Sequence, residues 1–326
     1  MRSKPSTMIP RTTLPILFLV GLPALGQVSF PDFSDPAGLA LNGSSATVDN
    51  GIDPAPVLRL VPAVDLGGNG GSAFTSEMVC VKGFSCFFEF RIGASGGFPD
   101  PNGEPGGDGL TFTIQGVGAN ALGWLGGGLG YGGLTPSIAV EIDTWQNPGQ
   151  DPDSNHVGID ADGDLVSLAA AGVPGRFDDG NLRSVWVDYD GVLLEVRVSD
   201  TGVRPAVATL ARIVDIPGVL GSEAGFVGFT AATFGAYGDH DIVSWSYQGT
   251  CGNLTIDGCD TGVENLLFTG GIQLSDLVNA CAAQATTHGG FVSCVASLTN
   301  GLKQAGILTG RQKSAIQSCA ARANLP

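Results

Sequence analysis

One stretch of the chain holds most of the side chains that could do chemistry together. Residues 140–160, VEIDTWQNPGQDPDSNHVGID, contain five Asp or Glu carboxylates, two asparagines and one of the three histidines. Paired carboxylates can serve as acid and base, carboxylates with a histidine can hold a metal ion, and an acidic loop can simply be solvated. Composition alone leaves these three interpretations open.

A metal site is the interpretation that uses most of these side chains. Alternate residues of a strand share one face, so Glu141, Asp143 and Trp145 are expected to lie together. Calcium prefers oxygen ligands, which predicts a shell made of Asp143, Asn147, Asp151 and the carbonyl oxygen of Trp145. A transition metal such as manganese also takes imidazole, which predicts a second shell made of Glu141, Asp143, Asp151 and His156. Asp143 and Asp151 would bridge the two ions.

The same strand also raises the question of catalysis. EIDTWQ resembles the motif E-I-D-x-x-E of bacterial β-glucanases, in which acidic residues flank a glycosidic bond. Retaining hydrolysis needs two carboxyl groups about 5 Å apart, one of them a proton donor. The position of the second acid is occupied by Gln146, which cannot ionise. We therefore expect binding without turnover.

Short strands are predicted to position these residues. Glycine accounts for 51 residues and charged residues for only 14%, which is typical of many tight turns. Segments rich in β-branched and aromatic residues alternate with Gly, Pro, Asn and Asp clusters, at 57–63, 86–93, 109–116, 137–145, 184–200, 224–233 and 241–248. Many strands without intervening helices indicate an all-β sandwich or barrel.

The pattern changes after Cys251. Apolar positions recur at helical spacing in residues 272–285, 289–306 and 309–323. We therefore predict a β domain over residues 27–250 and a small α-helical, cysteine-containing C-terminal domain over residues 251–326. This second domain resembles C-terminal modules of secreted bacterial proteins, so we expect a bacterial source.

Seven cysteines indicate an oxidising compartment. Cys80 and Cys86 flank Gly83 symmetrically, so a hairpin there would bring the two thiols face to face. The pairing of the others stays open among Cys251, Cys259, Cys281, Cys294 and Cys319. The odd number leaves one cysteine unpaired or bonded outside the chain.

Residues 1–26 have the pattern of a cleaved secretory signal. Arg2, Lys4 and Arg11 precede an apolar stretch that ends in small residues. No later stretch is long and apolar enough to span a membrane, so a secreted protein, extracellular or periplasmic, is expected. Without the signal the formal net charge goes from −16 to −19, because residues 1–26 contain three cations and no acid. That charge disfavours nucleic acid and suits neutral ligands and divalent cations.

Residues 140–160 closely resemble the metal-binding segment of the legume-type (L-type) lectins. That pattern runs E-x-D-T-aromatic-x-N, then D-P, then H-x-G-I-D, and its ligand positions are filled here by Glu141, Asp143, Trp145, Asn147, Asp151 and His156. The likeness continues in GDGLTFTIQ, GWLGGGLGYGG, VWVDYDGVLLEVRV and VGFTAATFGAYGDHDIVSWSY, and covers residues 28–248. It implies a concanavalin-like antiparallel β-sandwich, or jelly roll, that binds Ca²⁺ and Mn²⁺ or another transition metal.

The resemblance also implies a sugar site. Asp108 would accept hydrogen bonds from two sugar hydroxyls, and Asn147 would donate one through its amide. A backbone N–H of Gly126 or Gly127 would donate another, Trp145 would stack on the sugar ring, and the loop around Ala236 would shape specificity. The family usually has Ala before the aspartate, joined to it by a cis peptide, whereas this chain has Gly107.

Three functions therefore compete. The first is a calcium-dependent lectin that binds glycans or glycoconjugates without turnover. The second is a glycan hydrolase on the same sandwich, and the third is an adhesion module whose metals are purely structural. The sequence does not decide the sugar or the oligomeric state, for which a homo-oligomer is one option.

Overall fold

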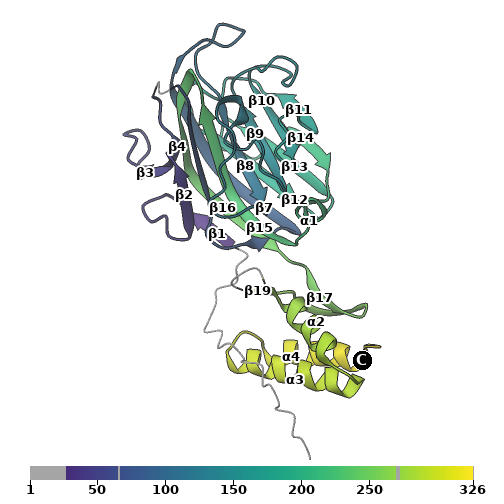
Figure 1. Ribbon diagram of the computed structural model, residues 1–326. Coiled ribbons are helices and arrows are strands. Elements are labelled where there is room, and N and C mark those ends of the chain that lie inside the picture. Colours follow the sequence, from purple (N-terminus) through teal and green to yellow (C-terminus); the bar gives the residue numbers. More distant parts are fainter. Residues whose placement is uncertain (1–26, 65–66, 269–271, 326) are drawn as a thin grey trace, which may run out of the picture.

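The computed structural model describes residues 27–64, 67–268 and 272–325. A β-sandwich comprises most of the chain, and a smaller, mainly helical unit lies beyond one end of it (Figure 1). The predicted signal segment 1–26 is outside the described residues, as is residue 326. No helix in the described part of the chain is long and apolar enough to cross a membrane.

The first sheet of the sandwich has eight antiparallel strands among the described residues. Their order is β14 (Leu210–Ile213), β13 (Leu193–Ser199), β12 (Arg183–Tyr189), β7 (Gly83–Gly97), β16 (Ala236–Thr250), β4 (Val57–Val61) and β3 (Ala46–Val48), with β1 (Gln27–Phe30) also paired to β16. The two long strands β7 and β16 form its centre (Figure 1).

The second sheet contains the strands that were predicted to hold the site. Their order is β11 (Ala169–Gly172), β10 (His156–Ala161), β9 (Ser137–Asp143), β8 (Gly109–Gln115), β15 (Ala224–Thr233), β5 (Asn69–Thr75) and β2 (Leu39–Gly43), with β6 (Val79–Cys80) also paired to β15. A short 3-10 helix, η1 (Gly126–Gly128), and helix α1 (Ile216–Leu220) lie in the connections. The predicted antiparallel β-sandwich is confirmed.

Aromatic side chains fill the space between the two sheets. Phe88 of β7 packs edge-on against Phe229 of β15, with ring centroids 5.0 Å apart, and Phe229 packs in the same way against Trp245 of β16 at 5.0 Å. These rings are almost completely buried. Strand alternation places them inward and leaves the polar neighbours outward, so one dry core fixes the register of both sheets.

The C-terminal unit has its own core, which is distinct from that of the sandwich. It contains the hairpins β17–β18 (Asn253–Ile256, Cys259–Glu264) and β19–β20 (Leu267–Phe268, Ile272–Gln273), and the helices α2 (Leu274–Gln284), α3 (His288–Gln304) and α4 (Gly310–Arg322). The three predicted helices are present. Side-chain caps by Thr287 and Thr309 define the starts of α3 and α4. The hairpins were not predicted.

The disulfides differ from the sequence-based expectation. Cys259 pairs with Cys319 and Cys281 with Cys294 inside the C-terminal unit, whereas Cys80 pairs with Cys251. The expected proximity of Cys80 and Cys86 is wrong, because Gly83 opens β7 and is not the tip of a hairpin. β7 pairs with β12 and β16, and Cys86 is buried in the core as the free cysteine of the described residues. Burial raises the pKa of its thiol.

Candidate metal and ligand site

The antiparallel pair β9–β10 builds an acidic cluster. Its register places His156 opposite Asp143 and Gly158 opposite Glu141, so three ligand-type side chains meet on one face. One ligand atom from each of Glu141, Asp143 and His156 lies within 4.8 Å of the others, and all three residues are buried. Gly158 makes this approach possible, because a Cβ atom there would lie 2.1 Å from Oε1 of Glu141.

Hydrogen bonds hold the imidazole in this cluster. Nδ1 of His156 lies 3.0 Å from the carbonyl oxygen of Asp153, so this nitrogen donates, and Nε2 lies 3.2 Å from Oε1 of Glu141. Burial opposes the charged imidazolium, but the hydrogen bond to Glu141 and the neighbouring carboxylates outweigh burial and raise the pKa of His156. The hydroxyl of Ser167 donates to the same Glu141 oxygen at 2.6 Å. Ser167 was not predicted from the sequence.

The cluster concentrates negative charge away from water. Burial, and then the charge of Glu141, raises the pKa of both Asp143 and Asp160 well above the ordinary value. Carboxylates in such a place are stabilised by a bound cation. The donor set of two carboxylates and one imidazole fits a transition metal, so the residues present suit the ion that the resemblance implies.

The remaining predicted ligands lie in the loop between β9 and β10. Trp145 N–H donates to Oδ1 of Asp143 at 2.6 Å, and Asn147 N–H donates to Oδ2 of Asp151. Burial raises the pKa of Asp151 to about 6. The structure thus brings Glu141, Asp143 and His156 together, and ties Asn147 to Asp151 separately. Asp151 lies outside this three-residue cluster but near enough for its charge, after burial and the charge of Glu141, to help raise the pKa of Asp143.

Asp108 lies beside this loop, at the start of β8. The peptide between Gly107 and Asp108 is cis, although Gly replaces the usual Ala. The side chain is 5% exposed, and its Oδ2 atom is buried without a hydrogen-bond partner. Burial raises the pKa of Asp108 to about 7. An unpartnered carboxylate oxygen is an acceptor that a hydroxyl-bearing ligand could satisfy.

The glycine-rich segment around η1 (Gly126–Gly128), here called the glycine loop, lies beside Asp108 and Asn147. A Cβ atom on Gly127 would lie 2.8 Å from both terminal atoms of the Asn147 amide, and one on Gly126 would lie 3.9 Å from Oδ2 of Asp108. Gly126 has a φ of 63°, which favours glycine. Asp108, Gly126, Gly127 and Asn147 are therefore adjacent, as the resemblance implied.

Trp145 and Ala236 both lie beside Gly107. A Cβ atom on Gly107 would lie 3.0 Å from Cβ of Ala236 and 3.4 Å from Cε3 of Trp145. Ala236 is buried, whereas the Trp145 side chain is partly exposed. Trp145 and Ala236 thus lie next to Gly107, as Gly126 lies next to Asp108, and Gly127 lies next to Asn147.

An arginine that was not predicted holds these loops together. Both Nε and Nη2 of Arg176 donate to Asp178 at 2.7 Å, Nη1 donates to Asp100 at 3.0 Å, and Nη2 donates to the carbonyl oxygen of Thr144 at 3.2 Å. The carboxylates of Asp100 and Asp178 are almost fully buried. Arg176 therefore links the loop before Asp108 to the end of β9.

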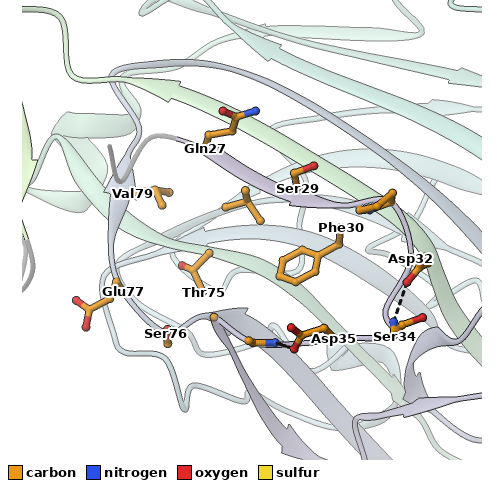
Figure 2. A pocket seen from close by; sticks show the side chains of 14 residues that line it. Gln27, Ser29, Phe30, Asp32, Ser34, Asp35, Thr75, Ser76, Glu77 and Val79 are labelled. Atoms are coloured by element: carbon orange, nitrogen blue, oxygen red, sulfur yellow. Dashed lines mark hydrogen bonds between the residues drawn. The ribbon is translucent and has the colours of Figure 1, made fainter. Parts of the chain in front are cut away.

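A separate cavity lies elsewhere in the sandwich. It has a volume of about 560 Å³ and is lined by β1, the following segment and residues 75–79. Figure 2 shows that two of its carboxylates face backbone N–H groups of their own turns: Asp32 accepts from Ser34, and Asp35 accepts from Ala37. The cavity includes none of the predicted site residues.

Comparison with known proteins places this geometry in a family. The legume lectin domain matches residues 28–257. The L-type lectin-domain containing receptor kinase VIII.1 of Arabidopsis thaliana is 34% identical over 179 residues, which are 52% of this chain and 24% of the kinase. A bark agglutinin of Robinia pseudoacacia is 38% identical over 115 residues, 35% of this chain and 40% of the agglutinin. The chain thus covers less than half the length of these relatives.

A solved structure supports the same assignment. The structure of basic winged bean lectin with Tn-antigen is 29% identical, covers 68% of this chain and 96% of that chain, and has a TM-score of 0.54. The matched proteins come from plants, so they do not support the expected bacterial source.

Proposed function

The chain belongs to the legume lectin domain family, and from this premise we propose that it is a calcium-dependent lectin that binds glycans without turning them over. Carbohydrate binding is the property that the lectin relatives support. The observation that carries the proposal is Asp108, whose buried Oδ2 has no partner and faces the glycine loop. A neutral sugar hydroxyl would satisfy this oxygen without any proton transfer.

The residues around Asp108 supply the other contacts that a sugar needs. The Asn147 amide and a backbone N–H of Gly126 or Gly127 would donate to ring hydroxyls. Trp145 would cover the apolar face of the ring. The loop at Ala236 would limit which sugar epimers fit. Donors, an acceptor and an aromatic surface together describe a recognition site for a neutral hexose.

Two metal ions are part of the proposal. Asp143, Asn147, Asp151 and the Trp145 carbonyl oxygen would hold Ca²⁺, and Glu141, Asp143, Asp151 and His156 would hold Mn²⁺ or another transition metal. The bound ions would supply positive charge that offsets the buried carboxylates and would order the loop between β9 and β10. The chain's own residues then orient the sugar acceptor and donors.

A hydrolase on the same sandwich is the competing function. Gln146 stands where the second catalytic acid of the β-glucanase motif would stand, and an amide cannot donate a catalytic proton. We therefore expect purified protein to leave β-glucans intact. Reducing ends that accumulate above the level of a heat-inactivated control would restore the enzyme hypothesis.

Localisation and organisation also belong to the proposal. Three disulfides support an extracellular or periplasmic location, because such bonds persist in oxidising compartments. Separate cores support a lectin domain over residues 27–250 and a C-terminal domain over residues 251–326. We propose no nucleic-acid partner, since the chain is strongly acidic. A homo-oligomer is left to direct measurement.

Glycan-array binding with and without a chelator tests the function. A lectin gives binding that the chelator abolishes and that added Ca²⁺ and Mn²⁺ restore. An adhesion module with purely structural metals gives a folded, metal-loaded protein that binds none of the glycans. That second result would overturn the lectin proposal.

A further inference from the structure

The Cys259–Cys319 disulfide of the C-terminal unit is open to attack from solvent on one side. It joins the first residue of β18 to the last turn of α4. Cys259 is partly exposed, whereas both cysteines of the Cys80–Cys251 pair are buried. A disulfide exchanges with a thiolate only where that thiolate can reach a sulfur atom. Cys259 meets this condition.

A cation contacts both sulfur atoms of this disulfide. Nη2 of Arg322 lies 3.2 Å from Sγ of Cys259 and 3.7 Å from Sγ of Cys319. Nε of Arg322 donates to the carbonyl oxygen of Ser318 at 3.2 Å, which helps to hold the guanidinium beside the disulfide. Unlike Arg176, Arg322 forms no ion pair with a carboxylate in the part of the chain that the structure describes. Its charge is therefore not neutralised by a neighbouring acid.

This position suits the chemistry of thiol–disulfide exchange. A thiolate attacks one sulfur atom, and negative charge in the transition state is shared by the attacking, the central and the leaving sulfur. A guanidinium that already contacts two of these three atoms stabilises that charge without having to move. The same cation attracts an attacking thiol that is itself anionic.

The Cys281–Cys294 disulfide of the same unit provides an internal comparison. It also joins a buried cysteine, Cys281, to a partly exposed one, Cys294. Residues 265–302 contain no lysine or arginine. Among the described residues no basic side chain donates to either of these two sulfur atoms, whereas Arg322 reaches both sulfurs of the other pair. The two disulfides thus share partial exposure and differ in the cation.

Two carboxylates next to Cys259 in the sequence oppose an anionic thiol. Oδ2 of Asp257 accepts a hydrogen bond from the N–H of Asn324 at 2.6 Å, and Oδ1 of Asp260 accepts one from the N–H of Gly262 at 2.8 Å. Both carboxylates are therefore engaged with backbone donors. Since Coulomb interactions weaken with distance, we expect the guanidinium, which contacts the sulfur atoms directly, to dominate.

The packing of α4 does not depend on this disulfide alone. α4 packs against α3 and β18 and buries Ile316 and Ala320 in the core of the C-terminal unit. The imidazole of His288 in α3 lies 3.0 Å from the carbonyl oxygen of Leu325 and 3.2 Å from that of Ala321. These contacts remain when the sulfur–sulfur bond is exchanged, so α4 can stay in place and the exchange can be reversed.

We propose that the Cys259–Cys319 disulfide is a thiol-exchange site, at which a small anionic thiol becomes attached to Cys259. The thiolate attacks Sγ of Cys259, because Cys319 is only 2% exposed. A sulfur–sulfur bond to the thiol forms, the bond to Cys319 breaks, and the electron pair leaves on Sγ of Cys319 beside Arg322. One disulfide is lost and one is formed, so no oxidant or reductant is consumed. The proposal does not depend on the lectin function.

Peptide mass spectrometry after incubation with reduced glutathione tests the proposal. The folded full chain, with its three disulfides, is incubated at neutral pH without denaturant, and samples are quenched with an alkylating reagent. We expect glutathione on Cys259 and the alkyl group on Cys319. These adducts should form about fivefold faster than adducts at Cys281 and Cys294, which is the size of effect that one exposed charge contact can supply. Added salt should reduce this advantage.

Variants of two arginines on α4 isolate the effect of the cation. Arg322→Gln should slow exchange at Cys259 about fivefold and leave the rate at Cys281–Cys294 unchanged. Arg322→Lys should retain part of the advantage, because it keeps the charge. Arg311→Gln is the matched control, since it removes the same charge from the other end of the same helix, and it should change neither rate. Loss of structure would accelerate exchange, so slower exchange cannot result from unfolding.

Three results would overturn the proposal. The first is exchange at Cys281–Cys294 that is as fast as at Cys259–Cys319, or an unchanged rate at Cys259 in Arg322→Gln. The second is glutathione on Cys319, which would mean that the direction of attack is wrong. The third is exchange that occurs only together with a loss of the helical circular dichroism signal, because the adducts would then report unfolding.

Discussion

The carbonyl oxygen of Asp108 accepts two hydrogen bonds from Thr144, one from its backbone N–H at 2.9 Å and one from its hydroxyl at 3.0 Å. Thr144 directly follows Asp143, a proposed metal ligand. The proposed sugar acceptor is therefore joined through one residue to the strand that carries the proposed metal ligands. A substitution that displaces Asp108 should therefore also disturb Asp143, and the reverse should hold.

Asp108→Asn separates sugar binding from metal binding. The substitution replaces one acceptor oxygen by a donor amide and removes the charge that strengthens both proposed sugar bonds. Since charge-assisted hydrogen bonds contribute ~1.5–3 kcal/mol each, sugar affinity should fall at least tenfold. Calcium content and fold should survive. Calorimetry measures the sugar affinity, and elemental analysis measures the calcium content. Unchanged sugar affinity would show that Asp108 is not part of the sugar site.

Asp143→Asn is the matched comparison. This substitution removes a carboxylate that both proposed metal shells use, so metal and sugar should be lost together. A variant that retains both ions and loses only the sugar would contradict the ligand assignment. The same two measurements on the two variants therefore distinguish a sugar acceptor from a metal ligand.

Chelation should abolish glycan binding and lower the Tm. Each proposed ion would bind the folded chain, and a ligand whose free concentration is a thousand times its Kd stabilises the folded state by ~4 kcal/mol. Differential scanning calorimetry with EDTA, and then with Ca²⁺ and Mn²⁺ restored, measures the effect. Glycan binding that persists in fully demetallated protein would show that the metal-site interpretation is wrong.

Arg176→Met should loosen the loop that precedes Asp108. It leaves the buried carboxylates of Asp100 and Asp178 without their partner, and breaking a buried ion pair on one side costs ~3–5 kcal/mol. We expect a lower Tm and at least tenfold weaker sugar binding. Arg176→Lys should show a smaller effect on stability, because it keeps the charge and loses the two parallel bonds to Asp178.

A triple variant distinguishes a role of Arg176 in positioning the sugar-site loop from a role in global stability. Asp100→Asn and Asp178→Asn, added to Arg176→Met, remove the uncompensated charges and should restore much of the Tm. Sugar affinity should stay weak, since the bond to the Thr144 carbonyl oxygen is still missing. Recovery of both properties would mean that Arg176 acts only through global stability.

The stabilisation of the folded chain by bound metal should increase as the pH rises. Burial raises the pKa of Asp108 to about 7 and that of Asp151 to about 6, so the metal-free folded chain holds more protons between pH 4 and 7 than the unfolded chain. Its stability therefore falls as pH rises through this window. Burial lowers the pKa of His240, so this residue changes the stability with pH in the opposite sense. Its contribution is the same in the metal-loaded and the metal-free protein, and it cancels in their difference.

The measurement is the Tm of the metal-loaded protein minus that of the chelated protein, from pH 5 to pH 7.5. We expect this difference to increase by several degrees, since 1 kcal/mol shifts the Tm of a domain of this size by ~2–4 °C. A difference that shrinks with rising pH would contradict the sign of these pKa shifts.

Local patterns in the sequence were enough to predict part of the site. Glu141 and Asp143 alternate on one strand, as their spacing predicts, whereas the strand register that places His156 opposite Asp143 was not predicted. The sandwich strands β4, β7, β8, β9, β12, β13, β15 and β16 and the three C-terminal helices follow from equally local periodicity, whereas the other eight sandwich strands of the described residues were not predicted. These features depend on neighbours in sequence or on one hairpin.

Contacts between distant segments could not be predicted in this way. Arg176 meets Asp100, which is 76 residues away, and nothing in GRFDDG indicates that partner. Cys80 and Cys251 are separated by 171 residues, and the nearer Cys86 offered a simpler pairing. That pairing fails because β7 runs straight from Gly83 between two partner strands, which turns Cys86 into the core.

The Cys80–Cys251 bond has a consequence for cleavage by proteases. All the residues proposed for metal and sugar contact, from Asp108 to Ala236, lie between these two cysteines. A protease that cuts once in any exposed loop of this interval leaves two fragments that remain covalently joined. The nicked molecule migrates as one species without a reductant and as two with it, and the halves of its binding site cannot diffuse apart.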